Sequence, residues 1–175
     1  SQSKYITVLS GDRIFNILRG LNLLEEKSYS SEDLKEVAHR GRVENILRGS
    51  YTKAGDTIRV NTMLQKADTG ELIGSDSAEG RGEESFFVMV DDLTKKIKAN
   101  FKLSSEEIAS DNDREVGRIT TSYPEAYKYY SEGTKYDHLG QLKKSIELME
   151  KAIEIDPEFA MAFRSMGISY NDMNY

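Results

Sequence analysis

The sequence of 175 residues contains no cysteine, no tryptophan and only two histidines. The absence of cysteine excludes disulfides, thiolate nucleophiles and thiolate metal sites. His39 and His138 lie in different halves of the chain, each at the end of a predicted helix, where an imidazolium suits the helix dipole. Because this spacing does not assemble a metal-binding pair, we predict no metal ion in this chain.

Long apolar runs and a strong charge of one sign are also missing. No stretch approaches the roughly 20 apolar residues of a membrane-spanning helix, and residues 1–4 lack the apolar core of a signal peptide. The 24 basic and 30 acidic residues give a net charge of −6 and form no basic cluster. We therefore expect no direct membrane segment in this piece and no nucleic-acid partner. The 38% of hydrophobic residues is enough for a globular core.

Three short motifs that resemble sites of chemistry are each incomplete. Asp68-Thr69-Gly70 matches the triplet of aspartic proteases, but that chemistry needs two such carboxylates, and this triplet falls in a predicted turn. Gly80-Arg81-Gly82 lacks the further glycine of a dinucleotide loop and predicts a flexible connection. Asp111-Asn112-Asp113 lacks the glycine and the closing glutamate of a calcium loop, which favours a solvated linker. We predict no catalytic residue and no cofactor.

The beginning of the chain predicts one strand and two helices. β-Branched and aromatic residues at 5–9 favour a strand, and apolar residues at helical spacing over 14–24 favour a helix. Ser30, with Asp33 three residues later, forms a capping box before a second, short helix. Gly41 is expected to end that helix.

After this helix, the spacing of the apolar residues changes from the helical period to every second residue. Residues 43–79 alternate between apolar and polar positions and contain two turns, which predicts a meander of three antiparallel strands. A strong amphipathic helix follows over 86–101, and its apolar stripe needs the meander to pack against. The polar residues 104–122 predict a linker or a loosely attached helix. The first part is therefore expected to be an α+β (mixed α/β) domain.

The last fifty residues repeat themselves. Four positions recur 34 residues later: Ala126, Tyr129, Gly133 and Tyr136 return as Ala160, Phe163, Gly167 and Tyr170. This period is typical of a helix-turn-helix repeat. A second amphipathic segment over 141–155, closed by Asp156-Pro157, lies between the two copies. We expect a truncated helical array over 123–175, with one full repeat at 126–159 and the first helix of a second at 160–175.

Three stretches of the first part match a known family: they run from Val43 to Tyr51, from Gly55 to Val60, and from Asp68 to Ile73, with Leu64 before the third. Through these residues the first part resembles the TolB amino-terminal type of domain, in the version that precedes repeat arrays in bacterial adenylate cyclases, receptor-like Ser/Thr kinases and winged-helix regulators. The resemblance covers about 5–103, and we expect this domain over 1–103. Arg42 and Asn45 depart from the family pattern at the entry to its first matched strand. The resemblance implies that the family's first strand and helix are missing before Ser1.

The last part resembles tetratricopeptide repeats. Leu139-Gly140, Ala152 and Asp156-Pro157 match the family pattern, whereas Glu132 and Ser145 stand where leucine and alanine are usual. The resemblance implies that the first helix of each hairpin lines an inner face that binds a protein or peptide. The residues on that face are Tyr127, Tyr130, Thr134, Asp137, Met161, Arg164, Ile168 and Asn171. The alternative is that this face packs on the preceding domain or on repeats that this chain lacks.

Together these patterns predict a non-catalytic protein-interaction or scaffold module from a larger bacterial signalling or envelope protein. It would bind a protein or peptide partner, or form a homo-oligomer through the open end of the repeat. The alternative is a small-molecule sensor domain that regulates an attached cyclase or kinase. The location stays open between the extracytoplasmic part of a membrane-anchored protein and the cytoplasm.

The truncation of the repeat leads to one further expectation. Repeat helices bury their apolar faces only against neighbours. We therefore expect Phe163, Met166 and Tyr170 to be exposed, covered by a second copy of the chain, or poorly ordered.

Overall fold

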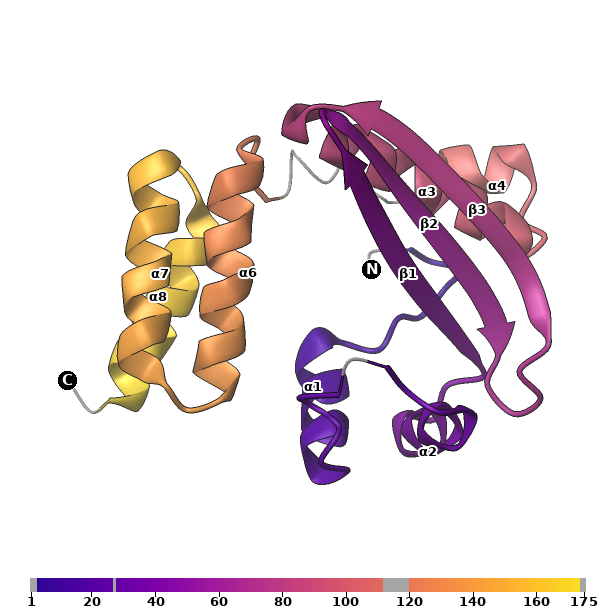
Figure 1. The fold of residues 1–175 in the computed structure, drawn as a ribbon, viewed down its shortest axis with the longest axis horizontal. Coiled ribbons are helices and arrows are strands. Elements are labelled where there is room, and N and C mark those ends of the chain that lie inside the picture. The colour runs from indigo at the N-terminus through magenta and orange to yellow at the C-terminus, as the bar shows by residue number, and fades with distance from the viewer. Residues whose placement is uncertain (1–2, 27, 112–119, 174–175) are drawn as a thin grey trace. The chain divides into compact units, whose positions relative to one another are not determined.

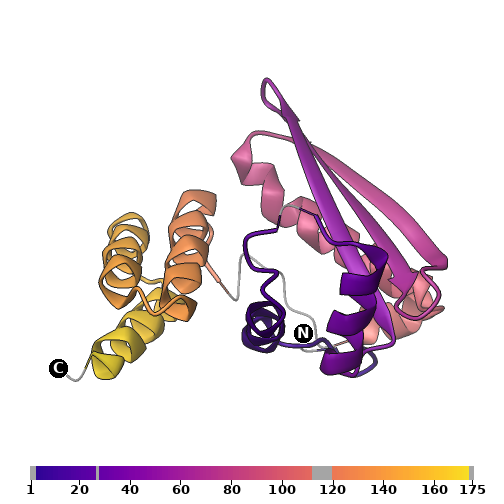
Figure 2. The ribbon, with the colours of Figure 1, turned by 60° about the horizontal axis from the view of Figure 1, so that its bottom comes forward.

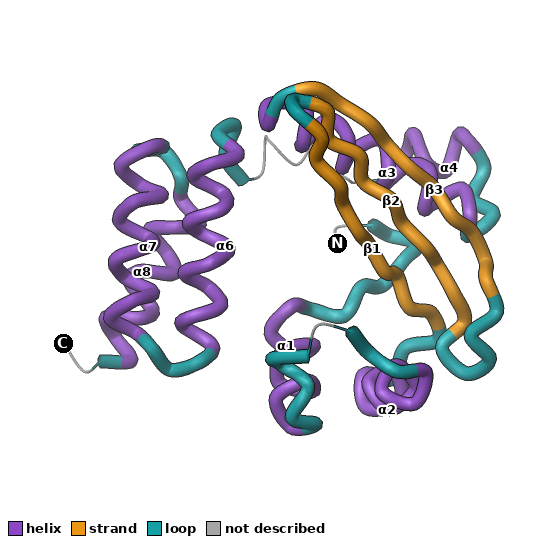
Figure 3. Tube along the Cα trace, viewed as in Figure 1, coloured by secondary structure: helices purple, strands orange, loops and turns teal. Residues whose placement is uncertain are grey.

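A computed structural model of the chain describes residues 3–26, 28–111 and 120–173 (Figure 1). The chain forms two compact units, residues 1–113 (unit 1) and 114–175 (unit 2). Unit 1 comprises α1 (Gly11–Gly20), α2 (Ser31–Gly41), β1 (Asn45–Ala54), β2 (Thr57–Lys66), β3 (Leu72–Arg81), a 3₁₀ turn (Glu83–Ser85), α3 (Phe86–Asn100) and α4 (Ser105–Ser110). Unit 2 comprises α6 (Pro124–His138), α7 (Leu142–Ile155) and α8 (Ala160–Asp172). The predicted α+β fold with C-terminal helices is confirmed (Figure 3).

The sheet is the predicted antiparallel meander in the order β1-β2-β3. A two-residue turn joins β1 to β2, and its Gly55 has a φ of 58°, which glycine adopts without strain. The next turn contains Asp68-Thr69-Gly70, where the Thr69 backbone amide donates a hydrogen bond of 2.8 Å to the Asp68 carboxylate. This triplet is therefore a turn, as predicted.

Helix α3 packs on one face of the sheet, against β2 and β3 (Figure 2). Ile58 and Ala78 from the strands meet Met89 and Leu93 from the helix in a buried apolar cluster. The alternation along each strand places these residues on one face, and the helical period places their partners on one stripe of α3. Gly80 and Arg81 are the last residues of β3, so the predicted flexible connection is wrong at these positions.

Helix α2 begins as the sequence predicts. Ser30 and Asp33 form a reciprocal capping box, in which the Ser30 hydroxyl accepts from the Asp33 amide at 3.1 Å. By contrast, the strand predicted at residues 5–9 does not form. These residues have β propensity but no pairing partner in the described sheet, and propensity alone does not hold a strand.

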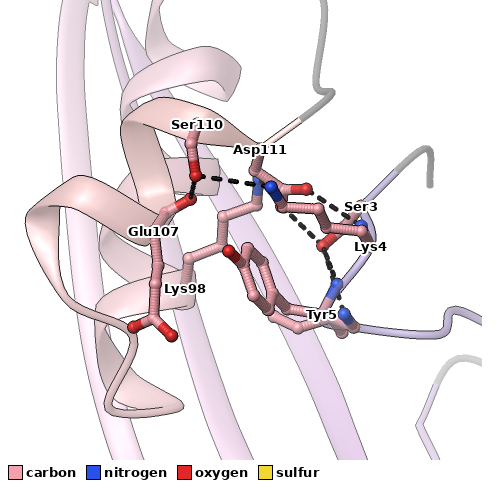
Figure 4. A network of polar contacts seen from close by, with 8 residues as sticks. Ser3, Lys4, Tyr5, Lys98, Glu107, Ser110 and Asp111 are labelled. Carbon is pink, nitrogen blue, oxygen red and sulfur yellow. Dashed lines mark hydrogen bonds and ion pairs between the residues drawn. The ribbon is translucent and has the colours of Figure 1, made fainter.

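Asp111 directly follows α4, and its buried carboxylate contacts residues from distant parts of unit 1 (Figure 4). Asp111 Oδ2 lies 2.7 Å from Lys98 Nζ, and the two side chains are 0% and 6% exposed. The Ser3 hydroxyl donates to Oδ2 at 2.6 Å, and the Lys4 backbone amide donates to Oδ1 at 2.9 Å. We call these four residues the Asp111 clasp. It ties the start of the chain to the end of unit 1.

The clasp corrects the interpretation of this region as a solvated linker. The Asp111 side chain is buried, and its charge is satisfied by hydrogen bonds from Ser3 and Lys4 and by the ion pair with Lys98 of α3. The helix α4 lies within the predicted linker 104–122 and begins with a capping box between Ser104 and Glu107. The hydrogen bonds from the amide and hydroxyl of Ser104 hold the pKa of the Glu107 carboxyl below its usual value. Residues 112–119 of that predicted linker lie outside the described residues.

In unit 2, α7 packs against both α6 and α8. Its core consists of five fully buried residues, Ala126, Met149, Ala152, Phe159 and Ala162. Gly140, with a φ of 72°, makes the turn between α6 and α7. The Thr121 hydroxyl donates to the Asp156 carboxylate at 2.5 Å and so ties the approach to α6 to the end of α7.

Removing the carboxylate of the clasp should destabilise unit 1. In Asp111→Ala, the buried Lys98 ammonium loses its ion-pair partner, which costs about 3–5 kcal/mol for a buried pair. Hydrogen exchange of the β2 amides reports the unfolding of this unit. Glu36→Ala is the matched control, because its pair with Arg40 is 46% exposed on each side and contributes less than about 0.5 kcal/mol. Equal effects of the two substitutions would contradict the role of the clasp.

Candidate functional site

The contact between α6 and α7 depends on a glycine of the repeat. A Cβ at Gly133 would lie 2.9 Å from Met149 Cε, 3.2 Å from the Ser145 carbonyl oxygen and 3.3 Å from Leu148 Cβ. These distances leave no room for a side chain, because they are shorter than ordinary van der Waals contacts. Gly133 is therefore a point of close contact between α6 and α7.

Two tyrosines flank that glycine on α6, and each meets a lysine of α7. Lys151 Nζ lies 5.7 Å from the centre of the Tyr129 ring, and Lys144 Nζ lies 3.9 Å from the centre of the Tyr136 ring. Lys144 also donates a hydrogen bond of 2.7 Å to the Tyr136 hydroxyl, which raises the pKa of the lysine. The α6 face thus presents a glycine between two rings, and an amphipathic helix covers it.

Among the described residues, nothing covers the equivalent face of α8. Phe163, Gly167 and Tyr170 stand 34 residues after Tyr129, Gly133 and Tyr136, and we call these three residues the open face of α8. Phe163 is 45% exposed and Tyr170 is 40% exposed, and a Cβ at Gly167 would have no atom within 4 Å. As expected, Phe163 and Tyr170 are exposed, whereas Met166 is half-buried against the unit 2 core.

The eight residues of the predicted inner face fall into two groups. Four lie on α6 and are half-buried: Tyr127, Tyr130, Thr134 and Asp137. Four lie on α8 and are exposed: Met161, Arg164, Ile168 and Asn171. The α6 and α8 helices contact each other. The α8 half of the predicted face is therefore open to solvent, while the α6 half contributes to the packing of unit 2.

The rings of the α6 half are part of the helical packing. The Tyr130 ring lies 5.0 Å from the Phe159 ring and 6.0 Å from the Tyr127 ring, measured between centres. Burial and the neighbouring Tyr130 raise the pKa of the Tyr127 hydroxyl above its ordinary value. The Thr134 hydroxyl donates to the Tyr130 carbonyl oxygen at 2.9 Å, one turn earlier. These residues can contact a partner only with their remaining exposed surface.

A buried polar chain connects all three helices of unit 2. The Ser169 hydroxyl donates to the Asp137 carboxylate at 2.7 Å, and it lies 3.3 Å from the Ser145 hydroxyl. Ser145 and Ser169 are fully buried. The pairing gives a physical reason for the serine at 145, where the repeat pattern has alanine. In the sequence, the serine at 145 in place of the usual alanine was a signal that this position has a polar contact. The sequence did not identify Ser169 as the partner.

Unit 1 contains a hollow of about 480 Å³ beside β3 and α3. Part of its polar lining is already engaged, because Lys96 Nζ lies 2.7 Å from Asp92 Oδ2 and donates to the Ser77 carbonyl oxygen at 2.9 Å. In the described ranges, no group of three or more His, Asp or Glu side chains is arranged to hold a metal ion. Within the same ranges, none of the helices combines the length and apolarity needed to cross a membrane.

Comparisons with known proteins find distant similarity to bacterial proteins. No protein-family model matches the chain. The sequence is 24% identical over 139 residues to "Putative adenylate cyclase 3" of Rhizobium meliloti (strain 1021), an alignment that covers 78% of this chain and 23% of that protein. The chain therefore spans less than a quarter of the length of this curated relative. The LpoB C-terminal domain from Salmonella enterica aligns at a TM-score of 0.38 and 18% identity, over 43% of this chain and 57% of that one.

Substitution by alanine should lower the stability of unit 2 at Gly133 and should not lower it at Gly167. Gly133→Ala places a methyl group against Met149 and the α7 backbone, and overpacking costs about 1–3 kcal/mol, partly offset by about 1 kcal/mol of helix propensity. Gly167→Ala gains that propensity without a clash, because the space around it is open. Hydrogen exchange of the α7 amides should show a loss of stability in Gly133→Ala and no loss in Gly167→Ala. A loss in both variants would show that the face of α8 is already covered.

Proposed function

We propose that the chain is a non-catalytic interaction and scaffold module of a larger bacterial signalling or envelope protein. In this proposal, unit 1 is a TolB amino-terminal-like domain and unit 2 is the start of a tetratricopeptide array. The open face of α8 binds a helix from a protein or peptide partner, or from another copy of the array. The observation that supports this proposal is the contrast between Gly133, packed on α7, and Gly167, with open space around it.

The chemistry of a suitable partner can be inferred from α7, the helix that already packs on α6. The α7 helix presents a serine at the crossing point, aliphatic side chains beside it, and a lysine for each ring of the α6 face. The open face of α8 carries the same glycine between a phenylalanine and a tyrosine. A suitable partner is therefore an amphipathic helix with small and aliphatic residues at helical spacing and a lysine placed for Tyr170.

The binding of a helix can be tested with a probe taken from the chain itself. A capped, fluorescein-labelled peptide with the sequence of residues 141–157 carries the α7 pattern and should bind the whole chain saturably in fluorescence anisotropy. Gly167→Leu fills the crossing point on the exposed surface and should weaken that binding at least tenfold, because side-chain volume there prevents close approach. The far-UV circular dichroism and Tm of the variant should match the wild type.

Two outcomes of this experiment would contradict the proposal. One is the absence of binding up to millimolar peptide. The other is binding that Gly167→Leu leaves unchanged, since the peptide would then occupy a different surface. Thr134→Ala is a useful second control, because Thr134 belongs to α6 and its hydroxyl bonds the Tyr130 carbonyl oxygen of the same helix.

The second candidate function is a small-molecule sensor for an attached cyclase or kinase domain. The hollow beside β3 and α3 is the feature that supports this candidate, although two of the four charged side chains that line it, Asp92 and Lys96, already pair with each other. A thermal-shift screen with nucleotides and common metabolites distinguishes the two functions. A sensor would show ligand-dependent stabilisation that Lys96→Ala removes, and an interaction module would give a flat screen.

A further inference from the structure

Helix α8 holds its place in unit 2 through one stripe of residues. These residues are spaced at helical intervals and begin directly before the helix: Phe159, Ala162, Met166 and Ser169. Three of them are fully buried, and Met166 is half-buried against the core of unit 2. Their spacing puts them on one side of the helix, toward α6 and α7. The stripe that α8 packs with is therefore apolar apart from one serine.

The equivalent stripe of α6 is charged. The residues that stand 34 positions earlier are Glu125, Lys128, Glu132 and Lys135, and all four are exposed. We call them the charged stripe of α6. Their signs alternate at helical spacing, an arrangement that stabilises a solvated helix face. Another face of the same helix carries Ala126 and Gly133, which are buried. Helix α6 is thus packed on one face and hydrated on the charged stripe.

The charged stripe is unsuited to contact with a further repeat helix. A helix packed on α6 in the way that α8 packs in unit 2 would bury Lys128 and Lys135 where α8 has a fully buried alanine and serine. Burying such charges is unfavourable unless each is paired and hydrogen-bonded, and a lysine does not fit in the space of a serine. The glutamate at 132, where the repeat pattern has leucine, has the same explanation. These charges are present whatever segment precedes Ser1.

We propose that α6 is the terminal cap of the helical array. Its charged stripe stays in solvent and prevents a further repeat helix, including one from a second copy of this chain, from packing on that side. Terminal repeats with a polar outer face keep repeat arrays soluble. The array therefore begins at α6 and can be extended only at α8. The cap does not depend on the helix binding proposed for the open face of α8, because the two features lie on different helices.

Thiol accessibility tests the cap in the whole chain, which has no cysteine of its own. Lys135→Cys places a thiol on the charged stripe, and Ser169→Cys places one at the equivalent position of α8. Alkylation by iodoacetamide is followed by mass spectrometry, and each rate is divided by the rate of the same variant in denaturant. This ratio should be near one for Lys135→Cys at micromolar and at millimolar protein. It should be at least roughly tenfold lower for Ser169→Cys, because a buried thiol reacts only after local opening.

A protected thiol in Lys135→Cys would overturn the proposal. Protection at micromolar concentration would mean that another part of the chain covers the charged stripe, and protection that appears only at millimolar concentration would mean that a second copy does. Lys135 is exposed, so this variant should fold, and its result stands even where Ser169→Cys does not. Circular dichroism checks the fold of both variants.

Exchanging residues between the two stripes tests whether the charges exclude a neighbour. Ala162→Lys combined with Met166→Glu gives α8 the charges of α6. Hydrogen exchange of the α8 amides should then become at least roughly tenfold faster, because the helix loses its packing while α6 and α7 remain together. An α8 that keeps its protection would overturn the proposal, since these charges would then be compatible with a packed neighbour.

The reverse exchange has a matched control. Lys128→Ala combined with Glu132→Met gives α6 the residues of α8, and Lys143→Ala combined with Glu147→Met makes the same two changes, at the same spacing, on exposed positions of α7. Both variants should leave the exchange of the unit 2 amides unchanged at micromolar concentration, because neither removes a packed contact. Faster exchange in the α6 variant alone would show that its charges bind a neighbour and would overturn the cap.

Discussion

Backbone pairing along β2 is the constraint on which unit 1 depends. This strand bonds β1 on one side and β3 on the other, so its backbone groups are satisfied within the sheet. Each neighbour then has one unsatisfied side, and the protein treats the two sides differently. Helix α3 packs along β3 and places Lys96 over its edge, whereas β1 has no such cover among the described residues.

Local signals account for most of the elements that the sequence predicted. The capping box of Ser30, the turn at Gly55 and the alternation along the meander each depend on residues a few positions apart, so the sequence shows them directly. The helix α4 carried the same kind of signal, Ser104 with Glu107, inside a stretch whose overall polarity suggested a linker. A loosely attached helix was one of the two alternatives predicted for this stretch, and α4 begins at this capping box.

Long-range contacts set the limit of sequence reasoning here. The burial of Asp111 depends on Ser3, 108 residues away, and on Lys98, and no local pattern reports such an encounter. The strand expected at residues 5–9 failed for the same reason, because a strand needs a partner that its own sequence does not specify. In the candidate site, the 34-residue recurrence identified Phe163, Gly167 and Tyr170. The hydrogen bonds that join Ser145, Ser169 and Asp137 required the packed helices.

The Asp111 clasp also determines how mechanical load would pass through unit 1. Because Ser3 and Asp111 are in direct contact, these two residues, 108 positions apart in the sequence, lie side by side in unit 1. Tension between flanking segments of a longer polypeptide would therefore act first on the clasp, while the strands of the sheet stay unloaded until it opens. Adjacent chain ends are also the geometry that tolerates domain insertion and circular permutation. Segments joined to the chain at these two residues would therefore stay close to each other in space.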